Sequence, residues 1–159
     1  MDYEIKDIEL NEKLTELNLV LPSGLTFIPE NFETAKTKDD FIFTESVMDI
    51  TKVFRSKSIE IKPLAGDSTK LRSRKNADWY GPAIFFSLTL ITENPTIVSV
   101  SLNVLSNYIT DFFKGSFGEK KVKLDIYVEK KGKKKIKKIS YNGSVEGLKE
   151  LEKIINSKD

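Results

Sequence analysis

The longest apolar segment of the chain covers residues 80–115, and Asn94-Pro95 divides it in two. In its first half, the apolar residues at positions 84, 85, 88 and 91 follow the spacing of one helix face. The β-branched residues of this half also allow a buried strand. Pro82 favours the helix, because its fixed φ and missing N–H suit a first helical turn.

The second half of this segment has a broad apolar face. Asn94 is a suitable N-cap, Pro95 suits the first helical position, and Gly115 suits the left-handed residue that ends a helix. The apolar residues of this face are Ile97, Val98, Leu102, Leu105, Ile109, Phe112 and Phe113. The two halves together predict a central helical hairpin over residues 80–115.

This hairpin is not expected to span a membrane. A spanning helix needs about 20 predominantly apolar residues. The second half carries a polar stripe of Asn103, Asn107 and Asp111, and the first half ends at Glu93, after about half of that length. A buried core element is the favoured interpretation.

The alternating leucines near the N-terminus predict strands. Residues 3–10 form a weak strand or a mobile arm, and residues 15–21 form a clearer strand. The turn residues Pro22, Ser23 and Gly24 then predict a hairpin with residues 25–28.

Further along, Thr44 is a suitable cap for an amphipathic helix that ends near Ser56. Residues 59–62 predict a short strand that Pro63 ends. We therefore expect residues 1–62 to form an acidic, strand-rich half with one helix.

Residues 65–76 are expected to form a long basic loop without internal structure. Such loops are often functional or mobile, so Arg72, Arg74 and Lys75 are candidate contacts for a partner or an anion. Trp79 and Tyr80 follow the loop. Packing at the end of the helical hairpin is favoured for both over stacking on a ligand, because aromatic side chains mainly supply buried area.

The end of the chain predicts a strand, a second strand and a helix over residues 120–156. Residues 121–129 alternate strictly. This alternation predicts an inward face of Val122, Leu124, Ile126 and Val128 and an outward face of Lys121, Lys123, Asp125, Tyr127 and Glu129. On the return strand, Ile136 and Ile139 are three positions apart, which predicts a bulge between them. Ser144 then caps the final helix. The chain is thus expected to be a single α+β domain.

Composition limits the chemistry that this chain can perform. Its 159 residues include no cysteine and no histidine, which excludes disulfides, thiolate sites and the commonest general base. Residues 1–50 carry twelve acids and four lysines, a balance of −8, whereas the rest carries twenty-two bases and twelve acids, a balance of +10. The acidic start resembles neither a signal peptide nor a transit peptide, so we expect a cytoplasmic protein.

A lysine run at the tip of the last hairpin is the strongest candidate contact surface. Seven of its nine residues are lysines, and no arginine or aromatic residue lies between them. Solvated lysines that prevent edge-to-edge aggregation are the favoured interpretation, with a surface for an anionic partner as the alternative. The lysines of this run are Lys130, Lys131, Lys133, Lys134, Lys135, Lys137 and Lys138.

Carboxylate patterns give weaker candidates. Glu60-Ile61-Lys62 follows Asp49 as in the Glu-x-Lys sites of restriction-type nucleases, but the same tripeptide pattern recurs at residues 4–6 and 129–131. Asp39-Asp40 lacks a third ligand and is expected to flank a helix. We therefore expect no metal and no cofactor.

The chain also resembles a known family at residues 94–115, NPTIVSVSLNVLSNYITDFFKG, and at residues 122–155, VKLDIYVEKKGKKKIKKISYNGSVEGLKELEKII. In their polarity, these segments look like the effector-associated constant components, small accessory domains of bacterial conflict systems. The resemblance implies a non-enzymatic partner of a separate effector, with no catalytic residues to carry over.

We expect a non-catalytic adaptor or regulatory module that binds another protein or a second copy of itself. One alternative is a protein that binds nucleic acid weakly and without sequence preference, through the lysine run and the basic loop. A weaker alternative is a metal-dependent nuclease.

Overall fold

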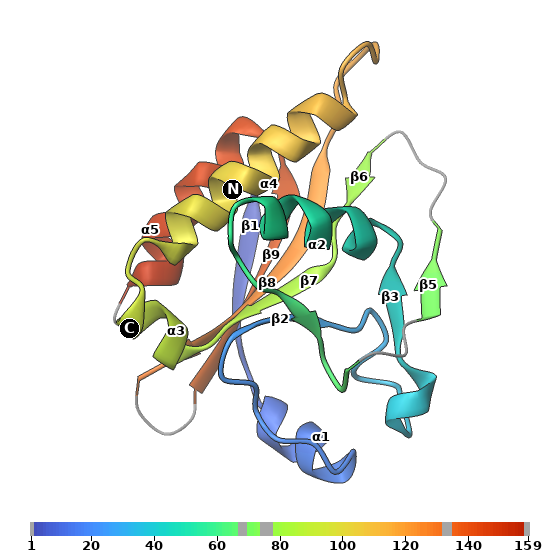
Figure 1. Ribbon diagram of the computed structural model, residues 1–159, viewed down its shortest axis with the longest axis vertical. Helices are drawn as coiled ribbons and strands as arrows, with labels where there is room; N and C mark the ends of the chain where they lie inside the picture. The colour runs from blue at the N-terminus through green and yellow to red at the C-terminus, as the bar shows by residue number, and fades with distance from the viewer. Residues whose placement is uncertain (1, 67–69, 74–77, 132–134, 158–159) are drawn as a thin grey trace.

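A mixed β-sheet with helices on one of its faces forms the centre of the molecule (Figure 1). The computed structural model describes residues 2–66, 70–73, 78–131 and 135–157. The strands are β1 (Tyr3–Ile8), β2 (Leu25–Ile28), β3 (Ile42–Thr44), β4 (Lys62–Pro63), β5 (Lys70–Arg72), β6 (Trp79–Tyr80), β7 (Ala83–Phe86), β8 (Val122–Lys130) and β9 (Lys135–Gly143). The helices are α1 (Leu10–Glu16), α2 (Ser46–Ser56), α3 (Leu88–Glu93), α4 (Ile97–Phe112) and α5 (Leu151–Asn156), with short 3-10 helices at Lys38–Asp40 and Glu146–Glu150.

The main sheet draws its strands from both ends of the chain. Their order is β1-β9-β8-β7-β2-β4, and β6 also pairs with β8. Strand β1, from the acidic first part, lies antiparallel to β9, and β2 lies between β7 and β4. Strands β3 and β5 form a separate parallel pair. The fold is α+β, as the sequence predicted, and its acidic and basic parts share one sheet.

The central helical hairpin expected at residues 80–115 is wrong in its first half. Residues 83–86 form strand β7, which lies between β2 and β8. Ile84, Phe85 and Phe86 are all buried, because both faces of the sheet are covered there. A strand that is buried on both faces is continuously apolar, and its pattern is hard to distinguish from that of a helix. Helix α3 is short, and α4 confirms a helix in the second half. The predicted start of this helix is wrong, because Thr96 is its N-cap and Asn94 instead ends α3.

The strand expected at residues 15–21 and its hairpin with residues 25–28 are also wrong. Leu10, Leu14 and Leu17 are spaced by four and three positions, and all three are buried, so this segment forms α1. The alternation of Leu17 with the leucines that follow it suggested a strand, but this residue caps the end of α1.

Two short strands differ from the expected elements. The strand expected at residues 59–62 is wrong except at Lys62, because β4 consists of Lys62 and Pro63, which pair in parallel with β2. The basic loop contains β5, so the expectation of a segment without internal structure is wrong at residues 70–72. The amphipathic helix α2 ends at Ser56 as predicted, but it begins at Ser46, since Thr44 belongs to β3.

Strand β8 agrees with the predicted alternation. Its pairing with β9 runs without interruption from Val122 opposite Gly143 to Lys130 opposite Lys135. The bulge expected between Ile136 and Ile139 is therefore wrong. The two side chains lie on opposite faces of the sheet, and both are fully buried. Because both faces of the sheet are covered, both side chains can be buried without a bulge that would bring them to the same face.

The final helical segment packs one apolar stripe into the core. Ser144 accepts a hydrogen bond at its Oγ from the Gly147 N–H (3.2 Å), as expected of a cap, although the N-cap residue is Val145. Leu148, Leu151 and Ile155 are buried, although the first turns are 3-10 rather than α-helical.

Candidate functional site

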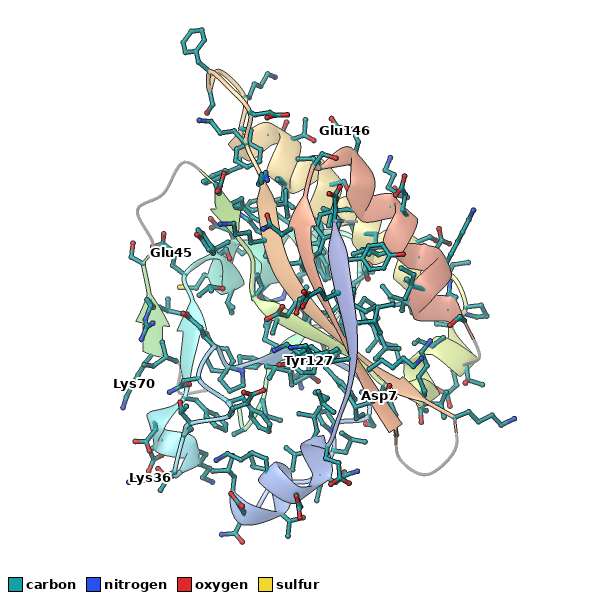
Figure 2. All side chains as sticks on the ribbon, turned by 180° about the vertical axis from the view of Figure 1, so that it is seen from behind. Asp7, Lys36, Glu45, Lys70, Tyr127 and Glu146 are labelled. Atoms are coloured by element: carbon teal, nitrogen blue, oxygen red, sulfur yellow. The ribbon has the colours of Figure 1, made fainter. Side chains whose placement is uncertain are left out.

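A concave site of polar character lies on the sheet face that points away from α4 and α5. It is a cleft of about 450 Å³, which we call the polar cleft. Figure 2 views this face, with Tyr127 near its centre. The polar cleft is formed by residues 28–34 and Thr44 on one side, by residues 80–83, and by side chains of β8 and β9.

Hydrogen bonds of Asn31 hold the first wall of the polar cleft in place. Its Nδ2 donates to the Asp40 carbonyl (2.7 Å), and its Oδ1 accepts from the Ile42 N–H (2.9 Å). Beside it, the Glu30 N–H donates to the Ile42 carbonyl (2.7 Å), and the Glu30 carboxylate pairs with Arg72 (3.3 Å). The wall is thus tied to β3 and β5.

The floor of the polar cleft centres on Tyr127, whose side chain the sequence pattern placed outward but the structure buries. The Lys138 ammonium lies 5.7 Å from the centre of its ring. Burial raises the pKa of the Tyr127 phenol well above its usual range, and the carboxylates of Asp125 and Glu33 raise it further. The phenol therefore stays protonated and neutral at physiological pH.

Tyr80 and Lys123 form the rim of the polar cleft. The Lys123 ammonium donates a hydrogen bond to the Tyr80 hydroxyl (3.2 Å) and lies 5.0 Å from the centre of the ring. The Asp78 carboxylate lies 3.6 Å from the same ammonium. The hydrogen bond to Tyr80 and the charge of Asp78 raise the pKa of Lys123, so this lysine remains charged.

A second, smaller cleft of about 60 Å³ adjoins the first and shares Thr44 and Tyr80 with it. We call it the Phe112 cleft, since the Phe112 side chain lines it while remaining 54% exposed. The other residues that line it are Glu45, Ser46, Arg72, Asp78 and Trp79. Exposure of Phe112 differs from the sequence expectation, which placed it in the buried face of α4.

Four of the residues predicted as contacts come together around these clefts. Tyr80 lines both clefts, Lys138 lines the polar cleft, and Arg72 and Trp79 line the Phe112 cleft. Lys131 is exposed on the tip of β8 and β9, and Lys137 lies opposite Asp7 of β1.

Trp79, by contrast, is a core residue. Its side chain is buried, and its ring packs edge-to-face on Tyr108 of α4 at 6.1 Å. Gly81 lies directly against the ring, where a Cβ atom would clash with it. The favoured packing role is correct for Trp79, although its partner element is α4 and not a helical hairpin. The residue also lines the Phe112 cleft, so contact with a partner there stays a prediction.

The prediction of solvated lysines is wrong for Lys130, whose side chain is buried at 5% exposure. Its ammonium donates to the carbonyls of Ile154 (3.1 Å), Ile155 (2.8 Å) and Ser157 (2.5 Å) at the end of α5. It therefore satisfies carbonyl groups in the last turn of α5, of which that of Ile154 also accepts a hydrogen bond from the Ser157 N–H (3.3 Å). Lys135 pairs with Lys130 across the two strands. The candidates Arg74, Lys75, Lys133 and Lys134 lie outside the described residues.

The structure adds site residues that the sequence reasoning missed, namely Asn31, Lys123, Asp125 and Tyr127. The last three occupy alternate positions of β8 and were assigned to its outward face. That alternation was a usable signal, because residues 123, 125 and 127 share one face of the sheet. Nothing in the local sequence marks Asn31, whose partners are nine and eleven positions away.

The carboxylates considered for metal chemistry have other partners. Glu60 pairs with Lys62 (2.9 Å) on the surface, and Asp49 accepts a hydrogen bond from Tyr108 (3.2 Å). Asp40 accepts backbone hydrogen bonds from residues 36 and 37. It lies within the 3-10 helix Lys38–Asp40 rather than beside a helix, and its side chain caps the start of that helix. Within the described ranges, no group of three or more acidic side chains is placed to hold a metal ion.

The described part of the chain contains no helix with the length and apolar character needed to cross a membrane.

Comparison with known proteins found no matching family model, no matching curated protein and no matching solved structure.

Proposed function

We propose that this protein is a non-catalytic, cytoplasmic interaction module that binds a segment of another protein across Tyr80. The observation that carries this proposal is the joining of two different clefts at Thr44 and Tyr80. One cleft offers charged and polar groups, and the other ends at an exposed phenylalanine. A segment with a charged or amide side chain next to an apolar one fits this combination.

The polar cleft has a suitable size and chemistry for side chains of a bound segment. Its volume of about 450 Å³ lies within the range of ligand sites. Lys123 and Lys138 supply positive charge, whereas Glu33 and Asp125 supply negative charge. Such a mixed lining favours a partner with both kinds of polar group over a purely anionic one.

The Phe112 cleft supplies the apolar anchor. Met48 lies on α2 within one turn of Glu45, which lines this cleft, and Met48 is also 54% exposed. Phe112 packs edge-to-face on Phe113 (5.6 Å), so its ring is held in place although one side is open to solvent. Exposed aromatic and methionine side chains are enriched at protein interfaces.

The contacts around Tyr80 reduce the entropy that binding would cost. The Ser46 hydroxyl donates to the Tyr80 carbonyl (3.5 Å), and Thr44 and Ser46 share a hydrogen bond (3.3 Å). Lys123 fixes the other end of the Tyr80 side chain. A site whose side chains are already ordered loses little freedom when a ligand binds.

The titratable groups of the polar cleft support a binding role over a catalytic one. A lysine that acts as a general base needs a lowered pKa, and a tyrosine base must ionise near neutral pH. The pKa values of Lys123 and Tyr127 are both shifted upward, away from these requirements. The association with a bacterial defence system rests on the sequence resemblance alone.

A capture experiment tests this proposal. Tagged wild-type protein, Tyr80→Ala and Phe112→Ser are incubated with nuclease-treated extract of the source cells, at low and at high salt. Lys131→Ala is the matched control, since Lys131 is exposed and lies in neither cleft. We expect a protein that wild type and control retain and both cleft variants lose.

Equal capture by wild type and Phe112→Ser would contradict the proposed site. Recovery of nucleic acid alone, in extract that has not been treated with nuclease, would support the nucleic-acid alternative.

A further inference from the structure

Strand β1 is an open edge of the main sheet. It pairs with β9 on one side, and no other strand among the described residues pairs with its second side. Its six residues, YEIKDI, leave a row of backbone groups that a further strand can use. Glu4, Ile5, Lys6 and Asp7 are exposed, and Ile5 is a large apolar residue in this position.

The register with β9 shows which backbone groups point outward. The Asn142 N–H donates to the Asp2 carbonyl (2.8 Å), at a position that continues the pairing of Tyr3 with Tyr141. Directly opposite residues of an antiparallel pair alternate between those that exchange hydrogen bonds and those that do not. Even-numbered residues therefore bond to β9, and the N–H and C=O groups of Tyr3, Ile5 and Asp7 face the open side.

The side chains of β1 divide between the two faces of the sheet. Lys6 lies opposite Lys138 on β9, and Glu4 lies opposite Ser140, so both belong to the face of the polar cleft. Ile5 lies opposite Ile139 and belongs to the other face. Two lysines directly opposite each other repel, which leaves Lys6 in need of a negative neighbour.

We propose that a second copy of this chain adds its β1 antiparallel to this edge, with the two-fold axis at Ile5. In this register, Ile5 lies opposite Ile5 of the second copy, and Tyr3 lies opposite Asp7. These are hydrogen-bonded pairs, and three such pairs give about six backbone hydrogen bonds. Glu4 lies opposite Lys6 of the second copy, twice, at the positions where side chains approach most closely.

The charges of β1 select this register over its neighbours. The outward N–H and C=O groups of the two strands can bond to each other only when odd-numbered residues lie opposite odd-numbered residues. The registers that allow this place the two-fold axis at successive residues of β1. An axis at Glu4 places two glutamates opposite each other, and an axis at Lys6 places two lysines opposite each other. Like charges in directly opposite positions destabilise a strand pair. The sequence of β1 is self-complementary only around Ile5.

This dimer uses a closed, isologous interface, which is the commonest form of homo-oligomer. It joins the two sheets into one continuous sheet. The proposal concerns a different surface from the Tyr80 clefts and does not depend on them. Since a single strand pair is a small interface, we expect a dissociation constant of roughly micromolar.

Sedimentation equilibrium at about 100-fold the expected dissociation constant tests the proposal with two charge variants. Glu4→Lys places the introduced lysine opposite Lys6 of the second copy, and Lys6→Glu places the introduced glutamate opposite Glu4, so each variant alone repels itself. We expect each to dimerise at least about tenfold more weakly than wild type. An equimolar mixture of the two restores both opposite-charge pairs, and we expect it to form heterodimers.

Ile5→Pro provides a test of the backbone geometry. The Ile5 N–H points to the open side, so proline removes two hydrogen bonds of the dimer, one from each copy, but none to β9. We expect a folded monomer, with a circular dichroism spectrum like that of wild type. A monomeric wild type, a dimeric Ile5→Pro, or a mixture of charge variants that does not associate would each overturn the proposal.

Discussion

At the scale of single residues, the lysine-rich hairpin divides into side chains with different surroundings. Lys130 is buried against the end of α5, and Lys138 lies over Tyr127 in the polar cleft, whereas Lys131 is exposed. The sequence shows one uniform run of lysines. Which of them is solvated depends on strand pairing and on the position of α5, and neither is encoded within the run itself.

The contrast between Lys130 and its neighbour gives a residue-scale prediction. Lys130→Met removes the donor for the last carbonyls of α5, so we expect the free energy of unfolding to fall by about 1–3 kcal/mol. Lys131→Met is the matched control and should change it by less than about 0.5 kcal/mol. Urea denaturation followed by circular dichroism measures both. Equal stability of the two variants would show that Lys130 does not cap α5.

At the scale of elements, α4 shows how far an apolar stripe predicts burial. Its periodicity predicted a helix correctly, and Leu105 and Ile109 are buried as expected. Phe112 follows the same spacing, but its side chain is 54% exposed and lines the Phe112 cleft. The spacing identifies the face of a helix, but it does not identify where the neighbouring elements end.

This difference predicts unequal effects of two alanine substitutions in α4. Leu105→Ala should lower the free energy of unfolding by about 2–5 kcal/mol, because it leaves a cavity in the core. Phe112→Ala should lower it by less than about 1 kcal/mol, since half of the side chain is already in water. Thermal and chemical denaturation of both variants provide the check. A large loss for Phe112→Ala would mean that its ring is buried in solution.

The hydrogen bond from Tyr108 to Asp49 connects α4 to α2 and predicts a pH dependence. Burial, and then the charge of Asp49, raise the pKa of Tyr108 to about 12, from an ordinary value near 10. The folded state therefore holds its phenolic proton more tightly than the unfolded state does. This contribution to stability is complete below about pH 10 and is lost as pH rises toward 12.

Tyr108→Phe removes this dependence. Because the side chain is only partly buried, we expect wild type to lose about 1 kcal/mol relative to Tyr108→Phe between about pH 9 and 12. Denaturation of both proteins across this range measures the difference, and other titrating groups cancel in the comparison. Parallel stability curves would contradict the raised pKa.

At the scale of the whole molecule, local sequence patterns predicted helices and strands better than they predicted which of these elements lie next to one another. Strand β8 could be predicted because its alternation agrees with the sheet along most of its length, with Tyr127 as a buried exception. The first part of the apolar segment could not, since β7 is buried on both faces. The polar cleft could not be predicted for a different reason. It is formed by segments that meet only after the sheet has formed, namely residues 28–34, residues 80–83, β8 and β9.

The assembled sheet also changes the meaning of the charge asymmetry. Along the chain, residues 1–50 and the remainder have balances of −8 and +10. In the fold, Asp7 lies opposite Lys137, and Glu30 pairs with Arg72 (3.3 Å). The two halves therefore neutralise each other locally, and the net charge of +2 gives little long-range attraction for phosphate.

Weak binding to nucleic acid is the expectation that follows from this arrangement. Each phosphate contact lowers the logarithm of the affinity by about 0.9 per unit of log salt on duplex DNA. With Lys130 buried and Lys138 in the polar cleft, few contacts remain on the described hairpin, so we expect a dissociation constant no tighter than about micromolar, and no binding near physiological salt. Fluorescence anisotropy with labelled duplexes of several sequences, titrated at increasing salt, measures this. Tight, sequence-selective binding that persists at physiological salt and weakens in Lys131→Gln would instead assign the exposed end of the hairpin to nucleic-acid recognition.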